Sequence, residues 1–483
     1  MIEKLPTGIT GFDQISYGGL PRGRATLVSG TAGSAKTVFV TQFLAEGIRQ
    51  RGEHGVFVTF EETPDDIRSN MISLGWDIPQ WEAAGQWAFV DVSPEPDMDS
   101  IFTGNYDLGA LVARIEHATR KVGAKRLAMD SIGSIFTQFT DAAIVRREML
   151  RVALGLKKLG VTSLITAERV TEYGEIARFG VEEFVADNVI ILRNALDGEK
   201  RRRTLEVLKY RGSSHQKGEF PFIVRTGEGI VALPLSAMEL KHAASNERTT
   251  TGLPELDAMC GSGFFRDTIA LVSGAPGTGK TLMGTSFLAG GAAAGERVLL
   301  FAFEESRGQM IRNAASWGFD LVEMERAGRL RIVSAYPETR GMEDHLVEMR
   351  RIIENFKPQR VVVDSLTALE RIAGATGFRE FVIGLMATLR EKEIAAVFTA
   401  TAASLASLDG AALPQAHLAT LTDAVILLRY IESYGEMRRG LSVLKMRGSA
   451  HNREVCEYEI NDSGLHIGPP LQAHANLLTG RPA

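Results

Sequence analysis

Two stretches decide the fold of this chain: Gly274-Ala275-Pro276-Gly277-Thr278-Gly279-Lys280-Thr281, and upstream the near copy Gly30-Thr31-Ala32-Gly33-Ser34-Ala35-Lys36-Thr37. The downstream stretch fits the phosphate-loop pattern G-x-x-x-x-G-K-[ST], and the upstream one fits it except at one position. Each follows a short apolar run, Ala25 to Val28 or Ile269 to Val272, and precedes a segment with helical periodicity. Because strand, loop and helix form the context that this motif requires, the sequence predicts two phosphate-binding loops on duplicated domains.

The chemistry of such a loop explains its composition. Glycines let successive backbone N–H groups turn inward around an anion, and the following helix adds its positive N-terminal end. We expect Lys36 and Lys280 to contact the β- and γ-phosphates of a nucleotide, and the hydroxyl groups of Thr37 and Thr281 to bind Mg²⁺. The sequence therefore predicts two nucleotide sites, each with a magnesium ion.

The first loop departs from the pattern at Ala35, which occupies the glycine position immediately before Lys36. We expect this position to open the helix with a negative φ, where alanine is permitted, and its methyl group to crowd the phosphates. The two sites are therefore predicted to differ in rate or affinity.

The two halves of the chain resemble each other well beyond the loops. The matched segments occur in the same order: Thr7-Gly8 with Thr251-Gly252, Phe60 to Thr63 with Phe303 to Ser306, Arg126 to Ser131 with Arg360 to Ser365, and Val207 to Gly212 with Val443 to Gly448. A length of 483 residues allows two or three domains, and the repeat favours two. We expect domains at 1–235 and 249–468, a linker at 236–248 and a short tail at 469–483.

Within each half, apolar β-rich runs alternate with helix-length segments, which predicts an α/β fold with a mainly parallel sheet flanked by helices. The late strands are expected to be antiparallel. One hairpin should join Asn188–Asn194 to Thr204–Tyr210, and the other should join Ala424–Tyr430 to Gly440–Met446. Each domain is therefore predicted to end in an antiparallel extension.

The composition narrows the class of protein. An apolar share of 45% with 23% charged residues is typical of a soluble globular protein, and no apolar run approaches the roughly 20 residues that span a membrane. The N-terminus shows no export signal, so we expect a cytoplasmic protein with no membrane partner. Cys260 and Cys456 are far apart and suit neither a disulfide framework nor a cysteine zinc site.

The charge gives no strong signal for nucleic-acid binding. The net charge is −5, whereas binding domains usually carry a basic face or stripe. The sharpest basic cluster, Lys200 to Arg203, is expected to be a solvated hairpin turn.

Acidic residues follow apolar strands at equivalent places in the two halves: Asp130 and Asp364, and the pairs Glu61/Glu62 and Glu304/Glu305. The aspartates are expected to hold the Mg²⁺ shell, and the alternative is that they cap the following turns. One glutamate of each pair is expected to take a proton from the attacking water, although the sequence does not choose between them. The alternative for the pairs is an acidic entry to a helix.

Basic pairs lie late in each half, at Lys209/Arg211 and Lys445/Arg447. They are too far along the chain for the sequence to place them at their own loop, and we expect them to serve the nucleotide of a neighbouring subunit. A cation supplied in trans can contribute about 10³ to 10⁵ in rate. The alternative is a basic strand end in solvent.

Taken together, these segments resemble KaiC, a family of double-domain ATPases and autokinases of the RecA/DnaB type. The more specific matches are Phe60 to Pro64, Lys209 to His215 with Lys217 to Phe222, and Tyr434 to Arg438 with Lys445 to Ser449. The resemblance covers almost the whole chain. It implies two tandem RecA-like domains, a homohexamer of stacked rings with ATP and Mg²⁺ between subunits, a KaiB-like regulator, and a place for all four basic residues against a neighbour's phosphates.

In that family the second repeat phosphorylates adjacent serine and threonine residues, and the matching segment here is Ala419-Thr420-Leu421-Thr422-Asp423. Alanine stands at the serine position, so the resemblance implies Thr420 as the phosphoacceptor, with Glu304 or Glu305 assisting its deprotonation. A two-site phosphorylation cycle is not expected. The alternative for Thr420 is a structural threonine that opens a strand.

Two other functions remain open. A DNA motor or recombinase on the same core should bring a basic groove or stacking aromatics, yet the chain is acidic with 7% aromatics. A nucleotide-gated scaffold would keep both loops but would need no general base. The paired glutamates favour the ATPase and Ser/Thr autokinase.

Overall fold

The computed structural model describes residues 2–93, 108–136, 142–177, 186–234, 244–401, 414–433 and 436–471. The chain divides into two compact units, Met1–Ala237 and Met238–Ala483, called here the first and the second unit. Most of the expected linker and most of the expected tail lie outside the described residues.

The first unit contains a mixed sheet whose strand order, among the described residues, is β11-β10-β9-β8-β3-β7-β6-β4-β5. Its strands are β1 (Lys4–Leu5), β2 (Leu20–Pro21), β3 (Ala25–Gly30), β4 (Gly55–Thr59), β5 (Trp87–Asp91), β6 (Arg126–Asp130), β7 (Thr162–Glu168), β8 (Asn188–Asp197), β9 (Lys200–Tyr210), β10 (Glu219–Arg225) and β11 (Gly229–Ala232). Its helices are α1 (Phe12–Ile15), α2 (Lys36–Arg51), α3 (Pro64–Ile72), α4 (Ile78–Ala83), α5 (Leu108–Val122), α6 (Gly133–Phe136) and α7 (Ala142–Leu159).

The second unit repeats this sheet in the order β16-β15-β17-β18-β14-β19-β20-β21-β22. Its strands are β12 (Arg248–Thr249), β13 (Phe264–Phe265), β14 (Ile269–Gly274), β15 (Val298–Ala302), β16 (Leu330–Ser334), β17 (Arg360–Asp364), β18 (Ala395–Thr401), β19 (Ala424–Ser433), β20 (Glu436–Met446), β21 (Cys456–Asn461) and β22 (Gly464–Pro470). Its helices are α9 (Pro254–Met259), α10 (Lys280–Ala293), α11 (Arg307–Ala315), α12 (Leu321–Arg326), the 3₁₀ helix η2 (Pro337–Thr339), α13 (Met342–Phe356), α14 (Leu366–Glu370), α15 (Ala375–Glu391) and α16 (Pro414–Leu421).

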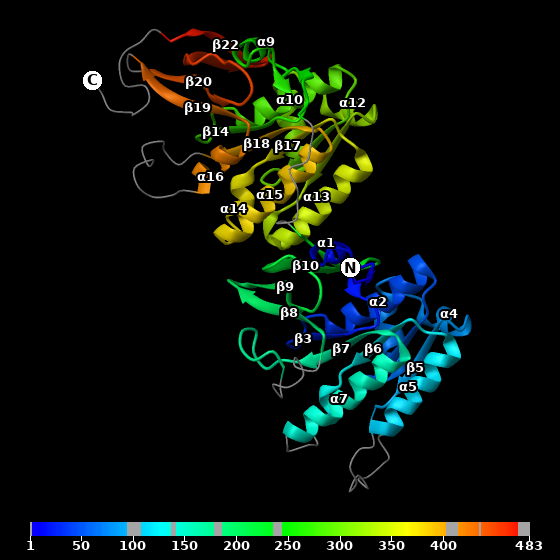
Figure 1. Cartoon of the computed structure of the whole chain (residues 1–483). Helices are drawn as coiled ribbons and strands as arrows, with labels where there is room; N and C mark the ends of the chain where they lie inside the picture. The colour runs from blue at the N-terminus through cyan, green and yellow to red at the C-terminus, as the bar shows by residue number, and fades with distance from the viewer. Residues whose placement is uncertain are drawn as a thin grey trace. The chain divides into compact units, whose positions relative to one another are not determined.

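The predicted fold class is confirmed in both units. The six strands from β5 to β8 in the first sheet pair in parallel, and β8, β9, β10 and β11 continue the sheet antiparallel. The second sheet has the same division, with β19 as the last parallel strand. Helices flank the parallel part of each sheet, as Figure 1 shows.

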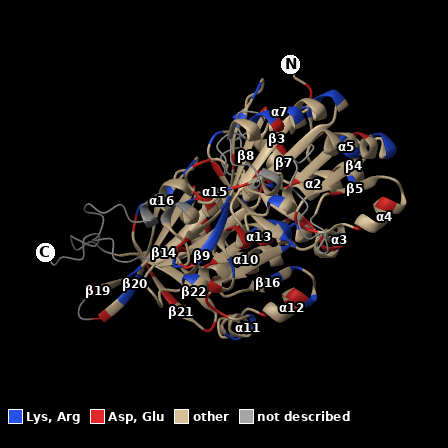
Figure 2. Ribbon diagram, turned by 90° about the horizontal axis from the view of Figure 1, so that it is seen from below, with Lys and Arg blue, Asp and Glu red and all other residues tan. Residues whose placement is uncertain are grey.

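The basic cluster Lys200–Arg203 does not form the hairpin turn that the sequence predicted. The turn is at Gly198 and Glu199, and the cluster begins strand β9, where Figure 2 shows it as a blue stretch. Arg203 Nε donates to the carbonyl oxygen of Gly33 at 3.1 Å, so the strand start contacts the first phosphate loop.

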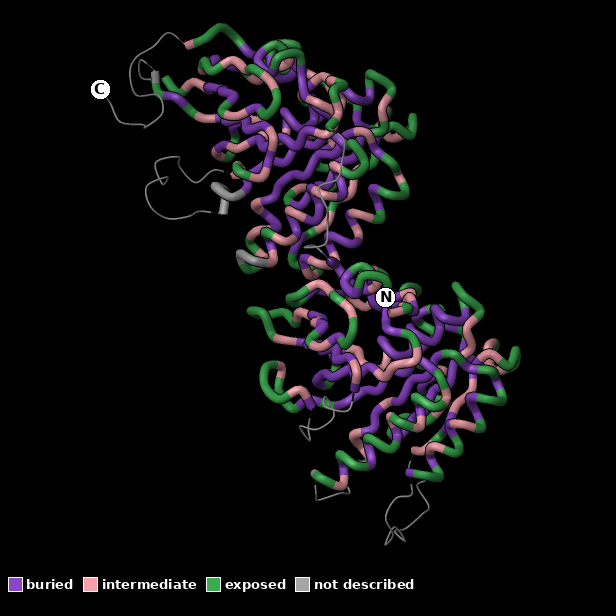
Figure 3. Tube along the Cα trace, viewed as in Figure 1, coloured by how far each residue is buried: buried purple, intermediate pink, exposed green. Residues whose placement is uncertain are grey.

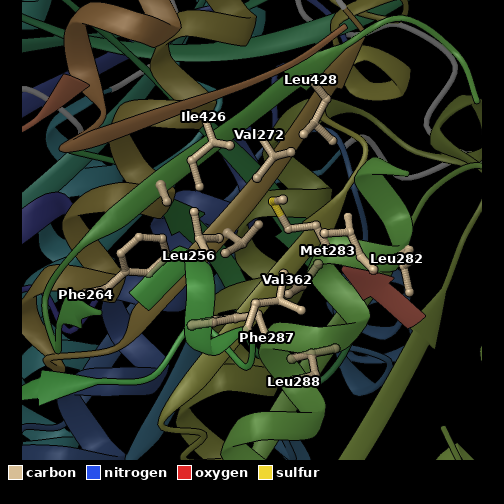
Figure 4. Close-up of a cluster of buried hydrophobic side chains, with 14 of the residues drawn as sticks. Leu256, Phe264, Val272, Leu282, Met283, Phe287, Leu288, Val362, Ile426 and Leu428 are labelled. Atoms are coloured by element: carbon tan, nitrogen blue, oxygen red, sulfur yellow. The ribbon is translucent and has the colours of Figure 1, made fainter. Parts of the chain in front are cut away.

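Burial explains why the central elements form. Strands β4 and β15 are buried along their whole length, because helices cover both faces of a parallel sheet. Helices α2 and α10 are buried from Phe39 to Ile48 and over most of Leu282 to Ala292, because each packs against several strands of its sheet. Figure 3 shows this buried centre in each unit, and Figure 4 shows the second unit's cluster around Leu256, Met283, Phe287 and Val362.

None of the helices in the described part of the chain is both long enough and apolar enough to cross a membrane.

Candidate nucleotide and phosphotransfer sites

Each phosphate loop joins a central strand to a buried helix of its unit. Lys36 Nζ donates to the carbonyl oxygens of Gly30 and Thr31, both at 3.1 Å. Lys280 Nζ makes the same contacts with Gly274 and Ala275, at 3.0 and 2.9 Å. Burial lowers the pKa of the Lys280 ammonium below its ordinary value. The two loops therefore share one geometry, in which each ammonium group lies over its own loop.

The position before the loop lysine has a positive φ in both units, so the expected negative φ at Ala35 is wrong. Ala35 has φ 69° and ψ 31°, and Gly279 has φ 90° and ψ 22°. Both residues precede the first helical residue as N-caps, and the loop reverses direction there. A non-glycine residue in the left-handed region costs about 1–2 kcal/mol, so the first loop carries strain that the second does not.

The predicted magnesium ligands lie together in each unit. Thr37 Oγ1 donates to Asp130 Oδ2 at 2.5 Å, and Thr281 Oγ1 donates to Asp364 Oδ2 at 2.7 Å. The other carboxylate oxygen of each aspartate accepts from a threonine of the neighbouring strand, Thr166 or Thr399. Burial raises the pKa of the Asp364 carboxyl, opposed by these hydroxyl donors.

These residues suit Mg²⁺ by their donor type. Among the described residues, no group of three or more histidine, cysteine or acidic side chains could hold a metal without other ligands. Mg²⁺ prefers oxygen ligands and is often bound by one or two carboxylates together with substrate phosphates and water. One threonine hydroxyl and one aspartate per unit therefore fit a magnesium ion that arrives with a nucleotide.

The two glutamates of each pair have different surroundings. Glu61 accepts from Ser131 Oγ at 3.1 Å, and Ser131 directly follows Asp130. Its neighbour Glu62 accepts instead from Asn70 Nδ2 at 3.2 Å, and Asn70 lies in helix α3. Burial raises the pKa of both carboxyls, and the Ser131 hydroxyl opposes this for Glu61. Among the hydrogen bonds of the described residues, Glu61 thus contacts the residue that follows Asp130, whereas Glu62 contacts helix α3.

The second unit repeats this difference. Glu304 accepts from Ser365 Oγ at 3.1 Å and forms an ion pair with Arg371 Nη2 at 3.2 Å. Glu305 accepts from Asn313 Nδ2 at 2.7 Å, and burial raises its pKa. Arg371 adds a cation for which the first unit shows no equivalent among its described residues.

Strand register places Lys445 and Arg447 away from their own phosphate loop. At the carboxyl end of β14, Gly274 pairs with Leu428, whereas at its amino end Ala270 pairs with Ala424, which pairs with Met446 on β20. A rise of about 3.3 Å per residue makes Ala270 and Gly274 about 13 Å apart. The basic pair flanks Met446 at the amino edge, so it lies at the opposite edge of the sheet from Lys280.

The basic pair of the second unit holds the backbone of the expected acceptor segment. Lys445 Nζ donates to the carbonyl oxygens of Ala419 at 2.8 Å and Thr422 at 2.5 Å. Arg447 Nη2 donates to the carbonyl oxygen of Thr420 at 2.8 Å, and its Nη1 lies 3.6 Å from Asp423 Oδ1.

The first unit has the same arrangement. Lys209 Nζ donates to the carbonyl oxygen of Ala186 at 2.8 Å, and Arg211 lies 3.6 Å from Asp187 Oδ1. The Arg211 and Arg447 side chains are 55% and 54% exposed, so both are accessible to solvent in the single chain.

Thr420 lies in the last turn of α16 and is exposed. The alternative that it opens a strand is wrong, because β19 begins at Ala424. Thr422, two residues later, is fully buried and donates to the carbonyl oxygen of Leu418 at 3.0 Å. Of these two hydroxyls, only that of Thr420 lies at the surface.

Sequence reasoning missed several residues of these sites: Ser131 and Ser365, Thr166 and Thr399, Asn70 and Asn313, and Glu172. The first three pairs had a signal, because each occupies the same place in both repeats. Glu172 had none, since it contacts the first loop from a segment that follows strand β7.

A family model described as the ATPase KaiC matches residues 5–237 and 249–472. The chain is 60% identical over 481 residues to the circadian clock protein KaiC3 of Synechocystis, covering all of this chain and 95% of that protein. It is 50% identical to the circadian clock oscillator protein KaiC of Thermosynechococcus vestitus and 49% identical to that of Synechococcus elongatus, covering all of this chain and 92% of each relative. Since the family model spans both repeats and the relatives match along the whole chain, this chain belongs to the KaiC family of ATPases.

Proposed function

We propose that the chain hydrolyses ATP at both phosphate loops and that its second unit is a Ser/Thr autokinase acting on Thr420. The coarse function, a KaiC-family ATPase, follows from the family. The rest of the proposal is supported by the side chains gathered around each loop and by the position of Thr420.

For hydrolysis, we assign the proton acceptor to the first glutamate of each pair, Glu61 and Glu304. Each accepts from the serine that follows the metal-site aspartate, whereas Glu62 and Glu305 accept from asparagines. A bound Mg²⁺ would neutralise charge on the phosphates. The loop lysine would bind the phosphates, and the glutamate would take a proton from the attacking water.

A single observation carries the autokinase proposal: Thr420 precedes β19 at the amino edge of the sheet, whereas Lys280 follows β14 at the carboxyl edge. A subunit's own nucleotide is therefore at the wrong edge for its own Thr420. Phosphate must come from a neighbour whose carboxyl edge faces this amino edge. Such a head-to-tail contact forms a ring when the rotation between subunits closes, and we take the assembly to be a homohexameric ring as in the family resemblance.

In this arrangement Thr420 Oγ1 attacks the γ-phosphorus of the neighbour's ATP. A new O–P bond forms, the bond between the γ-phosphorus and the β,γ-bridging oxygen breaks, and ADP leaves with the bond's electron pair. The neighbour's Glu304 takes the hydroxyl proton. Lys445 and Arg447 hold the backbone of the acceptor segment and present positive charge to the neighbour's phosphates.

The test uses two full-length variants that fail at different steps. Thr420→Ala lacks the acceptor but keeps its nucleotide site, and Lys280→Ala keeps the acceptor but lacks the loop lysine. We expect neither alone to gain label from γ-labelled ATP with Mg²⁺, and we expect label on Thr420 of the Lys280→Ala chain when the two are mixed and allowed to exchange subunits. Mass spectrometry locates the phosphate.

A mixture in which the Lys280→Ala chain gains no label, beside a wild-type chain that does, would contradict transfer from a neighbour, and label on the Lys280→Ala chain alone would show that transfer does not need Lys280. Phosphate release without any covalent label in the wild-type chain would leave an ATPase with a conformational output, and turnover that depends on DNA would favour the motor alternative. A KaiB-like regulator remains a prediction of the family resemblance.

A further inference from the structure

A short segment after strand β7 contacts the first phosphate loop. We call Arg169–Ala177 the strap. Arg169 N donates to the carbonyl oxygen of Gly30 at 3.1 Å, and Ser29 Oγ donates to the carbonyl oxygen of Ile176. Within the strap, the Arg169 guanidinium donates to the carbonyl oxygens of Glu175 at 2.9 Å and Gly174 at 3.1 Å. The strap is thus a folded turn attached at both ends to the strand that leads into the loop.

Glu172 connects the strap to the loop itself. Its Oε1 accepts from Thr31 Oγ1 at 2.7 Å, and its Oε2 accepts from the Asn194 backbone N–H at 3.0 Å. Thr31 and Asn194 are each 8% exposed. Hydrogen bonds to a carboxylate are stronger than those between neutral groups, so these two contacts fix the carboxylate firmly between the loop and strand β8.

The strap is in turn held from strand β8. Arg193 Nε donates to the carbonyl oxygen of Glu172 at 3.3 Å, and its guanidinium lies 5.1 Å from the centre of the Tyr173 ring. Arg193 is 6% exposed and forms an ion pair with Glu206 at 2.6 Å. The backbone and the carboxylate of Glu172 are therefore both held in place.

Thr31 links the Glu172 carboxylate to the lysine of the first loop. Its carbonyl oxygen accepts from Lys36 Nζ at 3.1 Å and from Ser34 Oγ at 2.8 Å, while its hydroxyl donates to Glu172. The Glu172 carboxylate therefore anchors, by its side chain, the residue whose carbonyl oxygen contacts the loop lysine. A misplacement of about 1 Å can cost about 10²-fold in rate.

The second unit lacks this contact. The residue equivalent to Thr31 is Ala275, which has no hydroxyl group, although Lys280 and Thr278 contact its carbonyl oxygen as Lys36 and Ser34 contact that of Thr31. The second site is therefore a control within the same chain.

We propose that Glu172 is a positioning residue of the first nucleotide site, which holds Thr31, and through it the loop, in the shape that receives the phosphates. The inference rests on the proposed binding of ATP by the first loop. The strap thereby influences turnover at the first site. The second site works without a contact of this kind, because Ala275 has no hydroxyl group.

The test uses full-length chains in a Lys280→Ala background, where the first loop carries the turnover, and measures ATP binding and phosphate release. We expect Glu172→Ala and Thr31→Val each to lower kcat about tenfold, with a smaller change in KM, and the double variant to lose no more than either alone. Glu172→Gln should retain most activity, because its amide can donate to Thr31 Oγ1 while its carbonyl accepts from the Asn194 N–H. Thr171→Ala is the matched control, because in the described part of the chain that hydroxyl donates to the carbonyl oxygen of Tyr173 within the strap, at 3.2 Å, and not to the loop.

Three outcomes would overturn the inference. The first is a Glu172→Ala chain that turns over like its parent. The second is an equal loss in a Lys36→Ala background, where only the second loop works, because that would show a general folding defect. The third is additive losses from Glu172→Ala and Thr31→Val. A Lys280→Ala parent that does not bind ATP at all would refute the proposed function of the first loop as well.

Discussion

A β-carbon added to Gly279 would lie 2.7 Å from Cδ1 of Ile460, closer than two such atoms can approach. The first unit has Ala35 at the position of Gly279. Strand register makes Val224 the equivalent of Ile460, since Val224 pairs with Ile230 and Ile460 pairs with Leu465 on the last hairpin of each unit. Valine has no δ-carbon, so the smaller side chain leaves room for the alanine methyl. The departure from the loop pattern at Ala35 is thus matched by a change on a strand distant in sequence.

Gly279→Ala is therefore expected to destabilise the second unit and to weaken its ATP binding. The methyl meets Ile460, and φ at this position is 90°, which costs an alanine about 1–2 kcal/mol. Adding Ile460→Val should recover the part of the loss that comes from the clash. Thermal unfolding and ATP titration measure both effects. A double variant no better than Gly279→Ala would show that Ile460 does not limit this position.

The two glutamates of the second unit should differ in a conservative substitution. Glu304→Gln is expected to lower ATP hydrolysis and Thr420 labelling by roughly 10²- to 10⁴-fold, because an amide takes no proton from water or hydroxyl. Glu305→Gln should lose far less hydrolysis and labelling, since the Glu305 carboxylate accepts from Asn313 rather than from Ser365. Steady-state phosphate release compares the two. The reverse order of activities would assign the proton acceptor to Glu305.

Lys445→Met is expected to abolish Thr420 labelling while its own loop still binds ATP. The ammonium holds the carbonyl oxygens of Ala419 and Thr422 at the amino edge of the sheet, away from Lys280. Labelling with γ-labelled ATP and nucleotide titration of the same preparation separate the two properties. Loss of nucleotide binding by the isolated subunit would indicate that Lys445 acts on its own site.

Cys260 should make the second unit less stable at alkaline pH. The residue is fully buried, and burial raises the pKa of its thiol from its ordinary value of 9.0 to about 12. Between these values the unfolded chain loses the proton and the folded chain keeps it, so stability is intact well below pH 9 and falls as pH rises, approaching about 1.4 kcal/mol per pH unit. Denaturant unfolding from pH 8 to 10 measures the slope. The unfolding free energy of the Cys260→Ala variant should depend less steeply on pH. An equal slope in both chains would assign the effect to other groups.

Much of the fold was predictable because its signals are local or repeated. The phosphate loops, the alternation of apolar runs with helix-length segments, and the two hairpins are patterns within short windows, and each occurs twice. The family also follows from these segments. The exact turn in the first hairpin was missed because Lys200 to Arg203 is polar enough for a loop, yet it pairs with β8 as a strand.

The candidate sites were predictable in residue type but not in arrangement. Sequence placed Glu61 and Glu62 side by side and could not choose between them, whereas the fold brings only Glu61 to Ser131. The sequence also gave no sign that Glu172 reaches Thr31, since the two residues are 141 positions apart in the chain.

The sequence by itself determined that this chain has two phosphate loops on two α/β units. Glycine, lysine and threonine at this fixed spacing, between a strand and a helix, form a phosphate-binding loop. Only the tertiary structure decided which groups surround each phosphate loop. The φ of Ala35, the separation of Lys445 from Lys280 and the contact of Glu172 with Thr31 all depend on strand order and register. Those are set by the packing of residues far apart in the chain, which no local pattern records.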